Sequence, residues 1–232
     1  MEEYSKIGIS EIDDVIPLIP KGYSFLVYGP PGVGKTIFGL QFLYDGVKKF
    51  DERGVYFALK DFPNNLRQKA LSLGFDLSKL EKDNMLILVD CFSQYVTMMS
   101  SEKFTSDISV NGILRTLKII IEKIGKVDRI VIDPVSIMFA ENKDIKEISK
   151  LVAMFDHLKI TNFLISMEED AKMLGYLCPG LIEMNLKNQS NQPTYLLIIK
   201  KLEGIRQRTP LHFPYKIVRG RGIHILKMPN NI

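Results

Sequence analysis

Residues 29–36 read Gly29-Pro30-Pro31-Gly32-Val33-Gly34-Lys35-Thr36 and match the pattern G-x-x-x-x-G-K-[ST] at every fixed position. The apolar run 24–28 before this stretch predicts a buried strand, and apolar residues at helical spacing from Ile37 onward predict a helix after it. A glycine-rich loop between a strand and a helix start is the setting that a phosphate-binding loop requires. A simple glycine turn is the alternative, and the flanking strand and helix disfavour it.

The chemistry of such a loop follows from its backbone and from its last two residues. Glycines let successive N–H groups turn inward around phosphates, and the helix N-terminus adds positive potential. Lys35 is predicted to reach the β- and γ-phosphate oxygens, and the Thr36 hydroxyl is predicted to bind Mg²⁺. All of residues 29–36 are therefore predicted to bind a nucleoside triphosphate.

The rest of the chain alternates predicted strands and helices, which favours an α/β fold with a largely parallel sheet covered on both faces. Further strands are predicted over 55–59, 85–90, 129–133 and 162–166, and helices over 64–73, 111–124 and 145–158. From about Thr194 the pattern changes to strands over 195–199, 215–218 and 223–226 without long helices between them. We therefore predict one domain over residues 1–232 that ends in an antiparallel extension of the sheet.

A carboxylate ends the predicted strand 129–133. Asp133 follows Ile130-Val131-Ile132, so a parallel sheet would place it at the carboxyl edge beside the phosphate loop. A carboxylate in that position can hold Mg²⁺ or its water shell. A turn or cap is the structural alternative for Asp133, and Asp90, which ends another apolar strand, is the second choice for the metal role.

Composition sets mild bounds on the partners and the compartment. The 232 residues include 31 Lys and Arg against 27 Asp and Glu, and a net charge of +4 does not by itself require nucleic acid. Cys91 and Cys178 have no metal-ligand spacing, which disfavours a disulfide scaffold and a structural zinc site. The chain has neither an apolar leader nor a long apolar run, so we expect a cytoplasmic protein that is not in the membrane.

Several segments outside the phosphate loop are also characteristic: 7–14, 40–43, 54–57, 66–76, 133–136 and 180–182. Through these segments and the loop, nearly the whole chain resembles the KaiC-like and RadA-paralogue branch of the RecA superfamily. The resemblance implies a RecA-like three-layer α/β fold, ATP with Mg²⁺ as the bound nucleotide, and a homo-oligomeric ring or filament with ATP at the subunit interfaces.

The chain departs from that family after its second strand. Relatives usually carry two adjacent acidic residues there, one of which orients or deprotonates the attacking water, whereas this chain has Lys60-Asp61. Loss of a general base typically costs about 10²- to 10⁴-fold in rate. Asp61 either supplies the base or caps the turn before Pro63.

A second departure lies near the C-terminus. The family's Lys-x-Arg-Gly segment, which reaches the ATP of the neighbouring subunit, corresponds here to Lys201-Leu202-Glu203-Gly204. The resemblance therefore implies a trans role for Lys201 without the accompanying arginine, whose absence can cost about 10³- to 10⁵-fold. Arg206 or Arg208 could compensate for the missing arginine, and solvated loop charges are the favoured alternative.

Two further positions have open interpretations. Ser166 or Glu168 lies where relatives place a polar residue that senses the γ-phosphate, with helix capping by Ser166 as the alternative. The basic cluster of Lys216, Arg219, Arg221 and Lys227 could contact single-stranded DNA or could be a solvated face. The functional hypotheses are a weak Mg²⁺-dependent ATPase, a non-hydrolysing ATP-dependent switch or assembly module acting on a protein partner, and a single-strand-binding repair accessory.

Overall fold

The computed structural model describes residues 4–140, 145–189 and 192–226. Its strands are β1 Tyr4–Ser5, β2 Ile19–Pro20, β3 Ser24–Tyr28, β4 Gly54–Ala58, β5 Leu86–Asp90, β6 Arg129–Asp133, β7 Thr161–Ile165, β8 Gly180–Gln189, β9 Gln192–Leu202, β10 Leu211–Val218 and β11 Gly222–Ile225. Its helices are α1 Ser10–Asp13, α2 Lys35–Phe50, α3 Pro63–Ser72, α4 Ser78–Lys82, α5 Phe92–Tyr95, α6 Val110–Ile124, α7 Ser136–Ala140, α8 Ile145–His157 and α9 Glu168–Leu174.

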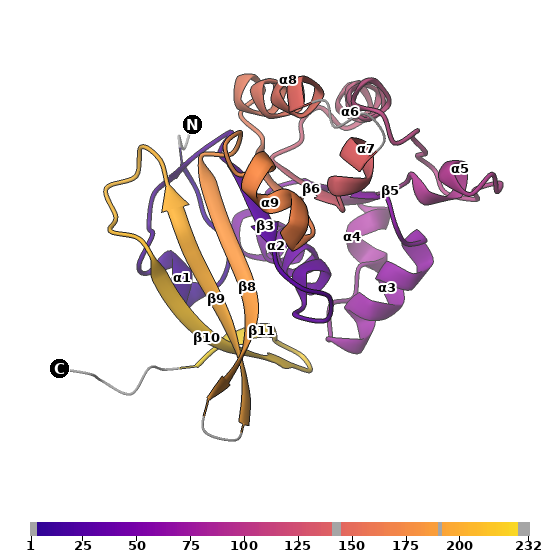
Figure 1. The fold of residues 1–232 in the computed structure, drawn as a ribbon. Coiled ribbons are helices and arrows are strands. Elements are labelled where there is room, and N and C mark those ends of the chain that lie inside the picture. The colour runs from indigo at the N-terminus through magenta and orange to yellow at the C-terminus, as the bar shows by residue number, and fades with distance from the viewer. Residues whose placement is uncertain (1–3, 141–144, 190–191, 227–232) are drawn as a thin grey trace.

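A central sheet joins nine of these strands in the order β11-β10-β9-β8-β3-β7-β6-β4-β5. The strands from β8 to β5 are all parallel, so their carboxyl ends meet at one edge. The strands from β8 to β11 pair antiparallel and extend the sheet on the other side, as Figure 1 shows. The predicted α/β fold and its antiparallel C-terminal extension are confirmed.

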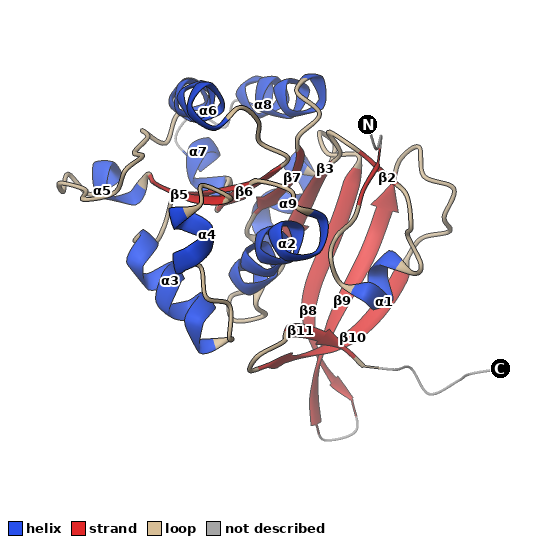
Figure 2. Ribbon diagram, turned by 180° about the vertical axis from the view of Figure 1, so that it is seen from behind, coloured by secondary structure: helices blue, strands red, loops and turns tan. Residues whose placement is uncertain are grey.

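Helices cover the parallel strands on both faces. Figure 2 shows α2, α3 and α4 on one face and α6 and α8 on the other. Because side chains alternate along a strand, Phe25 and Val27 pack toward α2, whereas Leu26 and Tyr28 join the core under α6 and α8. Strands β3, β4 and β5 are buried from end to end, which explains why they read as continuous apolar runs rather than as alternating ones.

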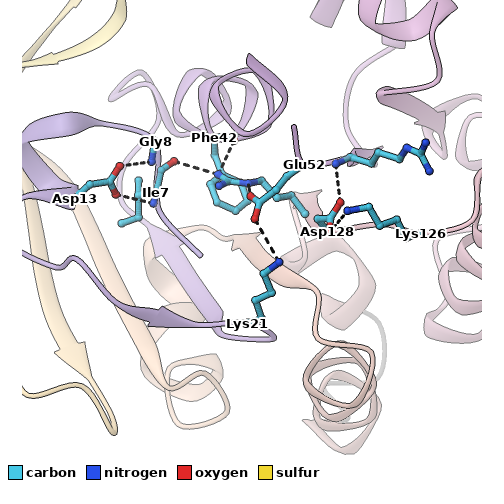
Figure 3. Close-up of polar contacts among 10 residues, drawn as sticks. Ile7, Gly8, Asp13, Lys21, Phe42, Glu52, Lys126 and Asp128 are labelled. Atoms are coloured by element: carbon cyan, nitrogen blue, oxygen red, sulfur yellow. Dashed lines mark hydrogen bonds and ion pairs between the residues drawn. The ribbon is translucent and has the colours of Figure 1, made fainter. Parts of the chain in front are cut away.

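The edge of the sheet opposite the carboxyl ends holds a buried polar cluster. The Arg129 side chain is fully buried, donates to the Glu52 carboxylate at 2.5 Å and lies over the Phe42 ring at 4.4 Å. Asp13 accepts from the backbone N–H groups of Ile7 and Gly8 (Figure 3). The cluster ties the N-terminal segment to the starts of the central strands.

Most sequence-based bounds differ from the observed ones by no more than a residue, and β3 and β6 coincide with their predictions. The long strand β8 was missed, although it joins the parallel strands to the antiparallel ones. None of the helices in the described ranges is long and apolar enough to cross a bilayer.

Candidate nucleotide-binding site

The predicted phosphate loop connects β3 to α2 at the carboxyl edge of the sheet. Gly34 is the N-cap residue of α2 and has a φ of 93°, a left-handed conformation that glycine adopts at low cost. A side chain at Gly29 would place its Cβ 1.9 Å from the Met184 carbonyl oxygen on β8. The glycines therefore allow both the turn and the close approach of the neighbouring strand.

The Lys35 ammonium lies over the loop that precedes it. Nζ donates to the carbonyl oxygens of Gly29 at 2.5 Å and Pro30 at 2.8 Å. Burial lowers the pKa of Lys35, Asp133 opposes that effect, and Lys60 adds to it. The predicted phosphate-binding cation thus lies at the centre of the loop.

Two predicted metal ligands come together from segments far apart in the chain. The Thr36 hydroxyl donates to the Asp133 carboxylate at 2.7 Å, at the junction of α2 with the end of β6. Because β6 lies two strands from β3, Asp133 comes within reach of the loop. Hydroxyl and carboxylate oxygens are ligands that Mg²⁺ accepts, so the donor set fits this ion.

Tyr56 is a member of this site that the sequence analysis missed. Its hydroxyl donates to the same Asp133 oxygen at 2.5 Å from a fully buried position on β4. Burial raises the pKa of Asp133, whereas the hydrogen bonds from Thr36 and Tyr56 lower it. Tyr56 therefore orients the carboxylate and favours its charged form.

Asp90 is far from this arrangement. It ends β5, which lies four strands from β3 at the edge of the sheet. Its carboxylate accepts from the hydroxyls of Ser93 and Ser100, both at 2.6 Å. Asp90 thus orders the segment that follows β5, and only Asp133 lies against the phosphate loop.

Asp61 lies close to the site but is occupied by other contacts. It forms an ion pair with Lys69 and accepts from Asn65 Nδ2 at 2.6 Å and from Phe62 N at 3.0 Å. Burial raises the pKa of Asp61, but these hydrogen bonds outweigh it and hold the pKa below its usual value. With Thr36 and Asp133, this carboxylate lines a cavity of about 240 Å³.

Lys201 lies away from the phosphate loop of its own chain. Lys201 on β9 pairs with Leu181 on β8, and Leu181 pairs with Leu26 on β3. Because Leu26 lies three residues before the start of the loop, Lys201 is roughly 10 Å from the loop along the strand direction. Its Nζ donates to the Gly175 carbonyl at 2.9 Å and lies 3.0 Å from Glu203. Within the described chain Lys201 forms no hydrogen bond with the loop.

The region after β7 also borders the site. Ser166 lines a cavity of about 430 Å³ together with Gly34, Lys35 and Thr36. Its hydroxyl donates to the Met167 carbonyl, and Met167 itself is the N-cap of α9, so the helix-capping alternative for Ser166 is wrong.

Strand β10 supports the loop from the side of the antiparallel strands. The buried Tyr215 hydroxyl donates to the Val33 carbonyl at 2.5 Å. A Cβ at Gly34 would lie 2.8 Å from Ile217 Cδ1. The C-terminal strands therefore help to fix the loop, which no local sequence signal indicated.

The hairpin formed by β10 and β11 carries most of the predicted basic cluster. Lys216, Arg219 and Arg221 are exposed and form no ion pair within the described residues, whereas Lys227 lies outside them. The tip of the hairpin contacts α3 through a 2.6 Å hydrogen bond from Gly220 N to the Leu73 carbonyl.

Comparisons with known proteins agree with this geometry. Residues 5–230 match the family model described as the KaiC ATPase. The chain is 29% identical to the circadian clock oscillator protein KaiC of Prochlorococcus marinus over 70% of this chain, and it spans about a third (32%) of that protein's length. A UPF0273 protein of Aeropyrum pernix is 25% identical over 97% of this chain and 100% of its own.

A solved structure has the same fold. The crystal structure of a KaiC-like protein from Pyrococcus horikoshii matches with a TM-score of 0.79 at 24% identity, over 97% of this chain and 99% of that one. Together with the family match, this likeness confirms the predicted resemblance. The chain belongs to the KaiC family of ATPases, within the RecA-like P-loop proteins.

Proposed function

We propose that this protein binds ATP with Mg²⁺ at residues 29–36 and hydrolyses it slowly in a cytoplasmic homo-oligomer, the whole chain acting as one ATP-binding domain. The observation that carries the proposal is the 2.7 Å contact between Thr36 and Asp133 beside the Lys35 ammonium. It joins the predicted metal ligands to the predicted phosphate cation in a chain that the KaiC ATPase family model matches over residues 5–230.

Each residue has a separate task in this proposal. Lys35 and the loop N–H groups bind the phosphates, while Thr36 and Asp133 would hold Mg²⁺, which neutralises charge on the phosphate oxygens when bound. Asp61 orients the attacking water and accepts its proton. Lys201 acts on the ATP of a neighbouring subunit, since it lies away from the loop of its own chain.

The test is ATP turnover with Mg²⁺, measured together with the mass of the protein in solution with and without ATP. Lys35→Ala provides the blank because it removes the phosphate cation and leaves the loop glycines in place. Turnover above this blank that rises with oligomerisation supports the proposal. Absence of ATP binding by the wild-type protein would refute it.

A non-hydrolysing switch that assembles with ATP and contacts a protein partner is the second candidate. It is favoured by the contacts of Asp61, which is paired with Lys69, and by the pairing of Lys201 with Glu203. Tight ATP binding with turnover no higher than that of Lys35→Ala would select it. A large gain in turnover for Lys60→Glu would show that the native lysine suppresses hydrolysis.

Single-stranded DNA binding by a repair accessory related to the RadA paralogues is the third candidate. The observation in its favour is the exposed hairpin with Lys216, Arg219 and Arg221, which no described carboxylate neutralises. Contacts with DNA phosphates weaken as salt rises. Binding that is absent at low salt, or that does not depend on salt, would refute this candidate.

A further inference from the structure

Lys60 occupies a distinctive place at the carboxyl edge of the sheet. The backbone after β4 stays bound to the end of β6, because Leu59 N donates to the Asp133 carbonyl at 2.8 Å. This hydrogen bond fixes the backbone that continues into Lys60, a residue that lines the same two cavities as Asp133. The position of Lys60 is therefore set by the same strand pair that sets the predicted metal ligand.

Lys60 lines two cavities that meet at the predicted metal ligands. The larger, of about 430 Å³, also contains Gly34 and Lys35 of the phosphate loop. The smaller, of about 240 Å³, is lined by Asp61, the residue proposed to orient the attacking water. Thr36 and Asp133 line both cavities. Lys60 is thus at the boundary between the phosphates and the water.

The charge of Lys60 has no partner in the described chain. Lys69 lines both cavities as well, but it forms an ion pair with Asp61. No carboxylate lies within ion-pair distance of the Lys60 ammonium among the described residues. The field of Lys60 nevertheless reaches the loop, since it lowers the pKa of Lys35. An exposed cation facing an anion-binding cavity is available for a ligand.

We infer that Lys60 binds the terminal phosphate of ATP within its own subunit and makes the site prefer a triphosphate to a diphosphate. This inference rests on the proposed function. The loop backbone cradles the inner phosphates. Lys60 faces that loop across the cavity, so its ammonium meets the outermost phosphate group. ADP lacks this group and leaves Lys60 without a partner.

The test measures equilibrium affinities for ADP and for a non-hydrolysable ATP analogue, both with Mg²⁺. Lys60→Met removes the charge and keeps the length of the side chain, whereas Lys60→Arg keeps the charge. Lys82→Met is the matched control, because Lys82 is an exposed lysine that ends α4 just before the start of β5, at the edge of the sheet opposite the phosphate loop and four strands from β3. The midpoint of urea unfolding verifies that each variant is folded.

We expect Lys60→Met to weaken binding of the analogue about tenfold or more, which corresponds to loss of a hydrogen bond to a charged group. ADP affinity should stay unchanged, Lys60→Arg should restore most of the affinity for the analogue, and Lys82→Met should change neither. Equal losses for both nucleotides, or no loss for either, would overturn the inference and leave the proposed function intact. Failure of the wild-type protein to bind any nucleotide would overturn both.

Discussion

The hydroxyl of Tyr56 donates a hydrogen bond to the Asp133 carboxylate, which is predicted to hold the metal. We expect Tyr56→Phe to lower the Mg²⁺-dependent affinity for ATP about tenfold or more, the value of one hydrogen bond to a charged group. Burial already raises the pKa of Asp133, and loss of the Tyr56 hydrogen bond raises it further. In the variant, the Asp133 carboxylate therefore becomes protonated at a higher pH than in the wild type. The loss in ATP affinity should grow as the pH falls.

Binding titrations with and without Mg²⁺ at pH 6 and pH 8 would measure this effect. Tyr44→Phe is the matched control, because the Tyr44 hydroxyl forms no hydrogen bond within the described chain and its ring stacks on Phe75. A Tyr56→Phe variant that binds ATP as the wild type does at both pH values would contradict the role given to Tyr56.

The pairing of Asp61 with Lys69 sets how well Asp61 can act as a base. Lys69 and the other donors hold the pKa of Asp61 low, which makes it a weak proton acceptor. Lys69→Met should free the carboxylate, raise its pKa and increase ATP turnover, while Asp61→Asn should reduce turnover by about 10²-fold or more.

Initial rates for both variants, with Lys79→Met on α4 as the control for loss of an exposed lysine, would test this pair of expectations. Turnover that is unaffected by Asp61→Asn would assign Asp61 to the turn before α3 and not to catalysis.

Among the elements, β10 links the antiparallel extension to the nucleotide site. The Tyr215 hydroxyl is buried and donates to the loop carbonyl of Val33. Tyr215→Phe leaves that carbonyl without its donor, so we expect a loss of about 1 kcal/mol in the free energy of unfolding and a several-fold loss in ATP affinity. Urea unfolding and nucleotide titration measure the two effects.

Tyr195→Phe is the matched control for this change. Tyr195 stacks on Tyr215 with ring centroids 5.4 Å apart, but its hydroxyl forms no hydrogen bond in the described chain. If both variants lose the same affinity, the hydrogen bond from Tyr215 to the Val33 carbonyl does not position the loop.

The elements also show what the sequence could and could not reveal. Continuous apolar runs identified β3 and β6, and the loop pattern identified the nucleotide site, because both signals are local. Strand β8 was missed because polar residues interrupt it, although the alternation of buried Ile182 and Met184 with partly exposed Glu183 and Asn185 is a strand signal. Tyr56 and Tyr215 read as ordinary core residues, since their partners lie 77 and 182 positions away.

At the scale of the whole molecule, the two edges of the sheet have separate roles. The carboxyl edge holds Asp133 and the phosphate loop, while Arg129 and Glu52 form a buried ion pair at the opposite edge. Arg129 begins β6 and Asp133 ends it, so the two sites are about 13 Å apart along the strand. Substitutions in the Arg129–Glu52 pair should therefore change stability without changing nucleotide binding.

Arg129→Met tests this separation. It leaves the Glu52 carboxylate without its buried partner, and breaking a buried pair in this way typically costs about 3–5 kcal/mol in the free energy of unfolding. The double variant Arg129→Met with Glu52→Leu replaces both charges by apolar groups and should recover most of the loss. Urea unfolding measures the stabilities, and titration at low temperature measures ATP affinity in the fraction that remains folded.

We expect that affinity to match the wild type in both variants, because neither change touches the phosphate loop. A double variant as unstable as the single one would mean that the contacts of Arg129 with the Phe42 carbonyl and ring, and not the ion pair, hold the start of β6. A loss of ATP affinity in the folded double variant would show that β6 transmits displacement of Arg129 to Asp133, and the two edges would then form one coupled unit.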